Sequence, residues 1–216
     1  MAVRIPIFPL SVVLFPHMPL PLHIFEERYR VMMRDCQEQG TGFGVVAIRE
    51  GIEVGAPASP HPVGTLAQLR SVEPLADGRF NILVVGASRY RISGVSTERP
   101  YLLADVNYLE DSAGDETRAR QLAARVSVAF VQYANDLRQL ADEAPAEFDL
   151  PEDPELLSYL VSATLQVENR HKQRLLEMDS ADDRLQGCLD LLRRENLLLA
   201  RQLAHHSVPL ATIDAN

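Results

Sequence analysis

The sequence changes character near residue 112, and this change limits the folds that the chain can adopt. Residues 1–112 carry short apolar runs separated by proline and glycine, which is typical of strands and turns. Residues 113–216 repeat apolar side chains every three to four positions, as amphipathic helices do. Charge divides at the same point, with 12 acidic and 10 basic residues before it and 18 and 11 after it. We therefore predict an α+β protein with domains at residues 1–112 and 113–216.

The first part is predicted to be a small β-barrel that holds one helix. Proline in the first strand places that strand at a sheet edge or entry, because proline has no N–H to donate. Asp77-Gly78 predicts a two-residue hairpin turn, and Gly86-Ala87-Ser88 predicts a bulge or a barrel corner. The apolar spacing of residues 26–39 predicts an amphipathic helix that ends at Gly40. Strands or extended segments are expected at residues 4–8, 18–24, 42–48, 64–75, 79–95 and 101–109, a set that indicates a closed or half-closed barrel.

The second part is predicted to be an α-helical bundle. Its first helix, residues 115–141, has apolar residues at heptad-like spacing. An acidic connection with three prolines follows at residues 142–155. Two shorter helices are expected at 154–165 and 168–178. The last helix is expected to begin at the capping signal Ser180-Ala181-Asp182-Asp183 and to carry a stripe of leucines.

Charge and hydropathy exclude several classes of partner. The formal net charge is −9, so neither nucleic acid nor an anionic membrane is expected as the main partner, because both are bound through an excess of Lys and Arg. No apolar run approaches the length of about 18 residues that a membrane span needs. The N-terminal residues contain prolines and no small-residue cleavage site, unlike a secretory signal peptide. We therefore expect a cytoplasmic protein.

The sequence contains no recognisable catalytic or cofactor motif. Lys172 is the single lysine of the chain, and it lies in a polar run that predicts a solvated position on a helix. No P-loop, no G-x-S-x-G nucleophile elbow and no metal-ligand spacing of histidines occurs. Cys36 and Cys188 are isolated; two reduced, packed thiols fit the pattern, and a bridge between them stays open. We expect a protein that is not an enzyme and that holds no metal or cofactor.

Several motifs, in order along the chain, resemble a known family. They are residues 5–10 (IPIFPL), 12–18 (VVLFPHM), 26–29 (EERY), 64–67 (GTLA), 77–79 (DGR), 86–92 (GASRYRI) and 172–178 (KQRLLEM). These motifs resemble the Lon substrate-binding domain, which is the N-terminal domain of the ATP-dependent Lon proteases and is also found as stand-alone bacterial proteins. The resemblance implies a PUA-like β-barrel followed by an α-helical bundle, and it covers roughly residues 4–200.

The resemblance also implies a function. A Lon substrate-binding domain is expected to bind exposed apolar segments of client proteins, or to act as an adaptor, without catalysis. Its partners would be proteins or unfolded peptide segments, with a separate Lon protease as a further candidate. The chain has no Walker motif and no Ser-Lys protease domain, so we expect neither ATPase nor peptidase activity from it.

Candidate binding residues lie around the proline-rich segment that precedes the first helix. Prolines stiffen this segment, which lowers the entropy lost on binding, and methionine suits loosely specific recognition. The alternative is that these side chains form barrel core. Three residues are expected to be structural: Glu26 opens the helix at its positive end, Arg28 pairs with a carboxylate or a barrel carbonyl, and Tyr29 packs inward. The expected protein-binding residues are His17, Met18, Leu20, Phe25 and Glu27.

Two further functions remain open from the sequence. A PUA-like barrel could bind RNA, which would require Arg79, Arg89, Arg91 and Arg99 to form one exposed basic face. An enzyme would instead require a pocket in which acidic groups converge.

Overall fold

The computed structural model describes residues 2–51 and 59–206, which form two compact units. Unit 1 comprises the described residues up to 112 together with 162–179, and unit 2 comprises 113–161 together with those from 180 on. The strands, in chain order, are β1 (Val3–Leu10), β2 (Pro19–Ile24), β3 (Phe43–Glu50), β4 (Ser59–Pro60), β5 (Val63–Pro74), β6 (Phe80–Ser96) and β7 (Leu102–Tyr108). The helices are α1 (Glu27–Gln39), α2 (Glu116–Leu140), α3 (Pro154–Thr164), α4 (Asn169–Glu177) and α5 (Ala181–His206).

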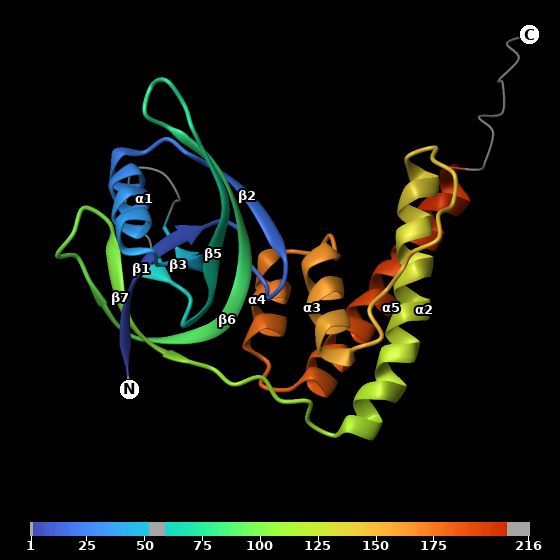
Figure 1. The fold of residues 1–216 in the computed structure, drawn as a ribbon. Coiled ribbons are helices and arrows are strands. Elements are labelled where there is room, and N and C mark those ends of the chain that lie inside the picture. Colours follow the sequence, from blue (N-terminus) through green and yellow to red (C-terminus); the bar gives the residue numbers. More distant parts are fainter. Residues whose placement is uncertain (1, 52–58, 207–216) are drawn as a thin grey trace, which may run out of the picture. The chain divides into compact units, whose positions relative to one another are not determined.

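The strands of unit 1 close into a ring (Figure 1). Neighbouring strands follow the order β1-β7-β6-β5-β3, and a parallel pairing of β1 with β3 joins the two ends. The strand β1 therefore closes the barrel, although the part of it that holds Pro6 pairs with β7 alone among the described strands. Residues 3–7 of β1 pair with β7 and residues 7–10 pair with β3, so each half has one neighbour. Proline is tolerated in such a strand because the side of the backbone that lacks an N–H faces no partner strand, as at a sheet edge.

The helix α1 packs against the barrel core as its spacing predicts. Tyr29, Met32, Met33 and Cys36 are all buried on one face, among apolar side chains of β1, β3 and β5. The helix ends at Gly40, whose φ of 63° lies in the left-handed region that glycine adopts without strain. The hydrogen bonds at this end are those of a Schellman motif, since the amides of residues 40 and 41 donate to carbonyls of the last turn.

The strands β5 and β6 form the long hairpin that the sequence predicts, with two local differences. The bulge is confirmed: Thr65 pairs with Arg89 and Ala67 with Gly86. The turn is not a two-residue turn, because Pro74 pairs with Phe80 and residues 75–79 form the loop. Its glycine, residue 78, has a φ of 78° and packs against a guanidinium group of α1. Tertiary packing therefore selects a longer loop than the local Asp-Gly signal predicts.

The short helix α4 belongs to unit 1. Gln173 donates from Nε2 to the Val63 carbonyl at 3.0 Å, which ties the helix to the start of β5. The domain boundary at residue 112 stays a prediction. In the structure, residues 162–179 also belong to the unit that contains the barrel. The expectation that Lys172 is solvated is wrong. Its side chain is half-buried and Nζ donates to the Ala163 carbonyl at 2.7 Å, so it caps the end of α3.

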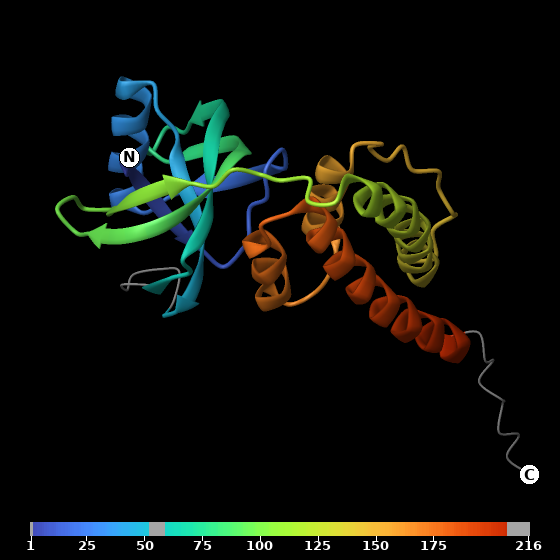
Figure 2. The ribbon, with the colours of Figure 1, turned by 90° about the horizontal axis from the view of Figure 1, so that it is seen from below.

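Unit 2 is built on the long helices α2 and α5, coloured yellow-green and red in Figure 2. The side chain of Asp115 caps α2 by accepting from the Arg118 amide, and Asn196 of α5 donates to the Ala129 carbonyl of α2 at 3.0 Å. The predicted ends of α2 lie within one residue of the observed ones. An α+β chain with a barrel followed by helices is thus confirmed.

Candidate functional site

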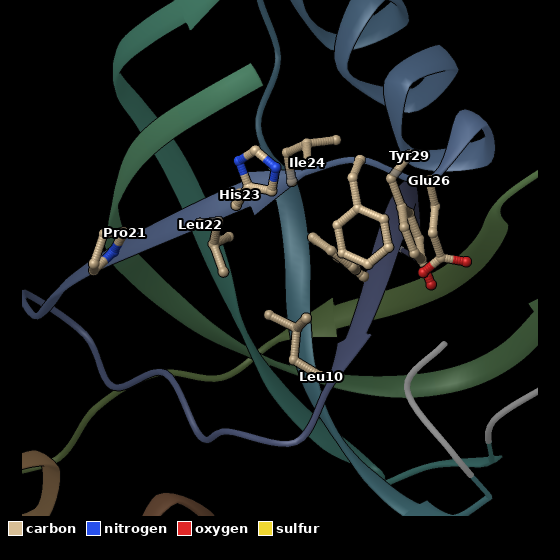
Figure 3. Close-up of a pocket in the computed structure, with 9 residues that line it drawn as sticks. Leu10, Pro21, Leu22, His23, Ile24, Glu26 and Tyr29 are labelled. Carbon is tan, nitrogen blue, oxygen red and sulfur yellow. The ribbon is translucent and has the colours of Figure 1, made fainter. Parts of the chain in front are cut away.

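A cavity of about 140 Å³ opens beside the start of α1 (Figure 3). Three elements of unit 1 supply its walls: β1, β2 and the first turn of α1. The lining residues are Phe8, Leu10, Pro21, Leu22, His23, Ile24, Phe25, Glu26 and Tyr29.

The floor of the cavity is apolar and rigidly packed. Phe8, Leu10, Ile24 and Tyr29 are buried, and all four belong to the barrel core. The rings of Phe8 and Tyr29 lie 4.0 Å apart between centroids, which fixes both side chains. The floor is therefore available before any ligand arrives.

The strand β2 supplies both the floor and the rim of the cavity because its side chains alternate between two faces. Leu20, Leu22 and Ile24 point toward the core, whereas Pro21 and His23 are exposed. Figure 3 shows Leu22 and Leu10 on one side of the strand and His23 on the other. The chain then leaves the sheet, and Phe25 remains 48% exposed at the mouth of the cavity.

The first turn of α1 is held by an ion pair and a ring contact. Glu26 occupies the N-cap position, and its carboxylate lies 3.0 Å from the guanidinium of Arg28. The same guanidinium stacks over the Tyr29 ring at 4.5 Å from its centroid, as a cation–π contact does. Because both side chains are largely buried, the pair fixes the direction in which the helix leaves the cavity.

A row of polar contacts crosses the strands next to the cavity. His23 Nδ1 lies 2.8 Å from Asn81 Oδ1, and Asn81 Nδ2 donates to Glu73 at 3.1 Å. The Asn81 amide is therefore oriented so that His23 Nδ1 carries the proton and Nε2 accepts from Arg79 at 3.3 Å. The His23 ring also stacks on Phe25, with 6.1 Å between centroids. This row holds the exposed aromatic ring in place.

Arg79 is itself paired at the end of this row. Its Nε donates to the Asp77 carboxylate at 2.6 Å. That hydrogen bond lowers the pKa of Asp77 and raises the pKa of Arg79. Both groups therefore stay charged at neutral pH.

The structure separates the eight residues that the sequence singles out. Phe25, Glu26 and Tyr29 line the cavity, and Arg28 braces it. His17 and Met18 lie before β2, at the end opposite Phe25, and the six residues of β2 that separate them from it span about 20 Å. Leu20 packs against the core, and Glu27 pairs with Arg30 and Arg34 on the outer face of α1.

Sequence reasoning missed six of the lining residues. Pro21 and His23 could have been predicted, because side chains alternate between two faces along residues 19–24 and these two fall on the exposed face that leads to Phe25. Leu22 and Ile24 follow from the same alternation. Phe8 and Leu10 line the cavity because β1 pairs with both β3 and β7 and so closes the barrel. No local sequence pattern predicts these pairings.

The four-arginine face required for RNA binding does not form. Arg89 is completely buried, and its Nε donates to the Asp111 carboxylate at 2.7 Å. Arg79 is paired with Asp77, as described above. The basic surface that RNA binding would require therefore lacks Arg89, and the charge of Arg79 on it is partly neutralised by Asp77.

The described residues contain no group of three His, Cys, Asp or Glu side chains placed to hold a metal ion. Cys36 and Cys188 are both buried free thiols. Within the described ranges, no helix is long and apolar enough to cross a membrane.

Comparison with known proteins decides the family. The model of the ATP-dependent protease La (LON) substrate-binding domain matches residues 4–194. The chain belongs to this Lon substrate-binding domain family. Lon protease of Escherichia coli strain K12 is 28% identical over 201 residues, which make up 91% of this chain and 25% of that protein. Lon protease of Xanthomonas oryzae pv. oryzae is 30% identical over 195 residues, or 88% and 23% of the two chains.

Solved structures confirm the fold. The Lon N-terminal domain protein from Xanthomonas campestris superposes with a TM-score of 0.63 at 23% identity, covering 87% of this chain and 98% of that one. The N-terminal domain of Mycobacterium avium complex Lon protease gives a TM-score of 0.62 at 19% identity, covering 88% and 98%. The chain spans about a quarter of the length of the curated relatives that it matches.

Proposed function

We propose that this chain is a non-catalytic protein-binding module that holds exposed apolar segments of client proteins at the β2–α1 cavity. Membership of the substrate-binding domain family supports protein as the substrate class. The observation that carries the proposal is Phe25, an aromatic side chain left 48% exposed at the rim of a cavity whose floor is apolar. Client segments held in this way could be passed to a separate Lon protease, with this chain as an adaptor.

The size of the cavity supports recognition of one side chain at a time. An apolar cavity of about 150 Å³ holds a benzene ring, so about 140 Å³ suits a single Phe or Leu side chain. Burying such a side chain contributes about 1.5–3 kcal/mol. A contact of this strength is weak and short-lived, which suits a module that samples many unfolded segments.

The experiment measures binding of a permanently unfolded probe, a reduced and carboxymethylated protein carrying a fluorophore, to the wild type and to Phe25→Ser. We expect Phe25→Ser to weaken binding about fivefold or more, because it removes the aromatic contact at the rim. Val95→Ser is the matched control, since Val95 is also 48% exposed and lies on β6, away from the cavity. Circular dichroism verifies that each variant is folded.

A further variant tests Met18, one of the binding residues predicted from the sequence. Met18→Asp, at the far end of β2, should leave binding unchanged if the cavity alone holds the segment. Equal weakening by Phe25→Ser and Val95→Ser would contradict the proposal. Binding of a labelled RNA by the wild type, with none of the unfolded probe, would replace it with the RNA alternative.

A further inference from the structure

On the side where β5 pairs with β3, β5 extends well beyond the end of β3. It pairs with β6 along almost its whole length, with a bulge between Leu69 and Ser71, but β3 pairs with residues 65–67 alone. From Gln68 to Pro74, no other described strand lies on that side of β5. An edge of this kind presents backbone N–H and C=O groups that are free to pair with another chain.

The pairing of β3 stops because the chain turns away at two glycines. Gly40 ends α1 in the left-handed region, and Gly42 approaches the backbone of β5 so closely that a Cβ atom there would lie 2.4 Å from the Ala67 carbonyl oxygen. Residues 40–42 therefore leave the sheet where β3 would otherwise continue alongside β5. The next position in the sheet has no strand from the described residues.

A groove of about 550 Å³ lies at this vacated position. Its walls come from the end of α1, from the glycine turn and from β5. Leu66 and Leu69 are half-buried in it, and Arg70 supplies the one charge among the lining residues. The lining residues are Cys36, Gln37, Gly40, Thr41, Gly42, Leu66, Gln68, Leu69 and Arg70.

Arg70 points to the charge of the occupant. It is exposed, and no described carboxylate forms an ion pair with it. An exposed positive charge beside an open strand edge favours an acidic side chain in the segment that pairs there.

The open edge of β2 shows the contrast. The Gly86 amide donates to the Met18 carbonyl, and the register that follows places Pro19 and Pro21 at positions whose backbone faces away from β6. These prolines have no N–H, so the outer edge of β2 is blocked against an added strand. The edge of β5 has no proline from Gln68 to Glu73, and the bulge between Leu69 and Ser71 is its one irregularity there.

We propose that the β5 groove binds an extended peptide segment of a partner protein, which adds as a strand next to residues 68–72. The segment carries one apolar side chain against Leu66, another against Leu69 and an acidic side chain opposite Arg70; the two leucines pack against different core clusters. Main-chain hydrogen bonds provide the affinity and the alternating side chains provide the specificity, as in other cases of strand addition. This surface is separate from the β2–α1 cavity and is independent of the function proposed there.

The test uses a labelled eight-residue peptide of alternating Thr and Val with one central Asp, measured by fluorescence anisotropy. A second peptide, N-methylated at alternate residues, has no amide donors on one edge and should bind about tenfold more weakly or worse. Arg70→Glu should weaken binding of the first peptide about fivefold, and a peptide with Arg in place of Asp should recover it. Arg91→Glu is the matched control, because Arg91 is another exposed arginine of unit 1.

Nuclear magnetic resonance then locates the peptide. We expect shifts of amide signals at residues 40–42 and 66–72, and unchanged peptide affinity in Phe25→Ser. Equal binding of the N-methylated peptide, equal weakening by Arg91→Glu, or shifts confined to residues 20–29 would each overturn the inference. Loss of unfolded-probe binding in Phe25→Ser alone would leave it standing.

Discussion

Replacing Arg89 with methionine should destabilise unit 1 by about 3–5 kcal/mol. Methionine keeps an unbranched apolar stem of similar length but removes the charge and every donor. Breaking a buried charged pair by removal of one partner has a cost of this size, because the other partner stays behind without compensation. With a total stability of about 5–15 kcal/mol for a typical protein, the change is a large fraction of what holds the unit together.

The magnitude follows from what Arg89 contacts. Its side chain is fully buried, and it donates to the Asp111 carboxylate at 2.7 Å and to the carbonyls of Leu176 and Met178 at 2.8 and 2.7 Å. Those two carbonyls lie at the C-terminal end of α4, where helix geometry leaves acceptors unsatisfied. One guanidinium therefore joins β6, the segment after β7 and the end of α4.

Urea denaturation, followed by circular dichroism, measures the loss of stability, and hydrogen exchange assigns it. We expect the amides of α4 to lose protection first in Arg89→Met. Asp111→Asn should cost less, because the Asp111 side chain is 21% exposed and water can replace part of its partner. In the double variant the two losses should not add, since each removes the same ion pair.

A loss of unfolding free energy below about 1 kcal/mol in Arg89→Met would refute this reasoning, since an ion pair at the surface contributes no more than that to stability. Strict additivity of the two substitutions would refute the pairing. Arg184→Met provides a comparison in unit 2, where a second fully buried arginine stacks over the Tyr159 ring at 4.0 Å.

Three further predictions concern other parts of the chain. The hydrogen bond from the Ser180 hydroxyl lowers the pKa of Asp182, so the stability that this carboxylate provides is lost as pH falls through its folded pKa. Urea titrations below about pH 4 should therefore show a smaller loss of stability in Asp182→Asn than in the wild type. Gly42→Ala should cost about 1–3 kcal/mol, because its Cβ would overlap a β5 carbonyl oxygen, whereas Gly94→Ala, with 3.5 Å to its nearest atom, should cost less. Burial raises the pKa of Cys36 to about 11, so a thiol reagent at pH 8 should modify it after unfolding and not before; rapid modification of the folded protein would contradict the assignment.

Local signals were sufficient for much of the secondary structure. The Asp115 side chain and the glycine at residue 40 are end signals that act within one turn of a helix, and the predicted helix ends agree with the structure within about a residue. The β5–β6 hairpin and its bulge also follow from adjacent residues. The loop at Asp77-Gly78 differs because it packs against Arg30, which is far away in sequence.

Contacts between distant segments could not be predicted from local patterns. An exposed and a buried arginine look alike in a strand, so the burial of Arg89 by α4 gave no signal. Lys172 lies in a polar run, yet the end of α3 draws it inward. In the candidate site, Phe25, Glu26 and Tyr29 were found because they are neighbours in sequence, whereas the β1 side of the cavity depends on how the barrel closes.

The most direct test of the central proposal is a nuclear magnetic resonance titration of the isotope-labelled chain with two short peptides. One peptide is serine-rich with a single phenylalanine, and the other has serine in place of that phenylalanine. The account predicts that the first peptide shifts the signals of residues 21–29 and of Phe8 and Leu10, which line the cavity, and that the second does not. Identical shifts with both peptides, or shifts that spare these residues, would contradict it.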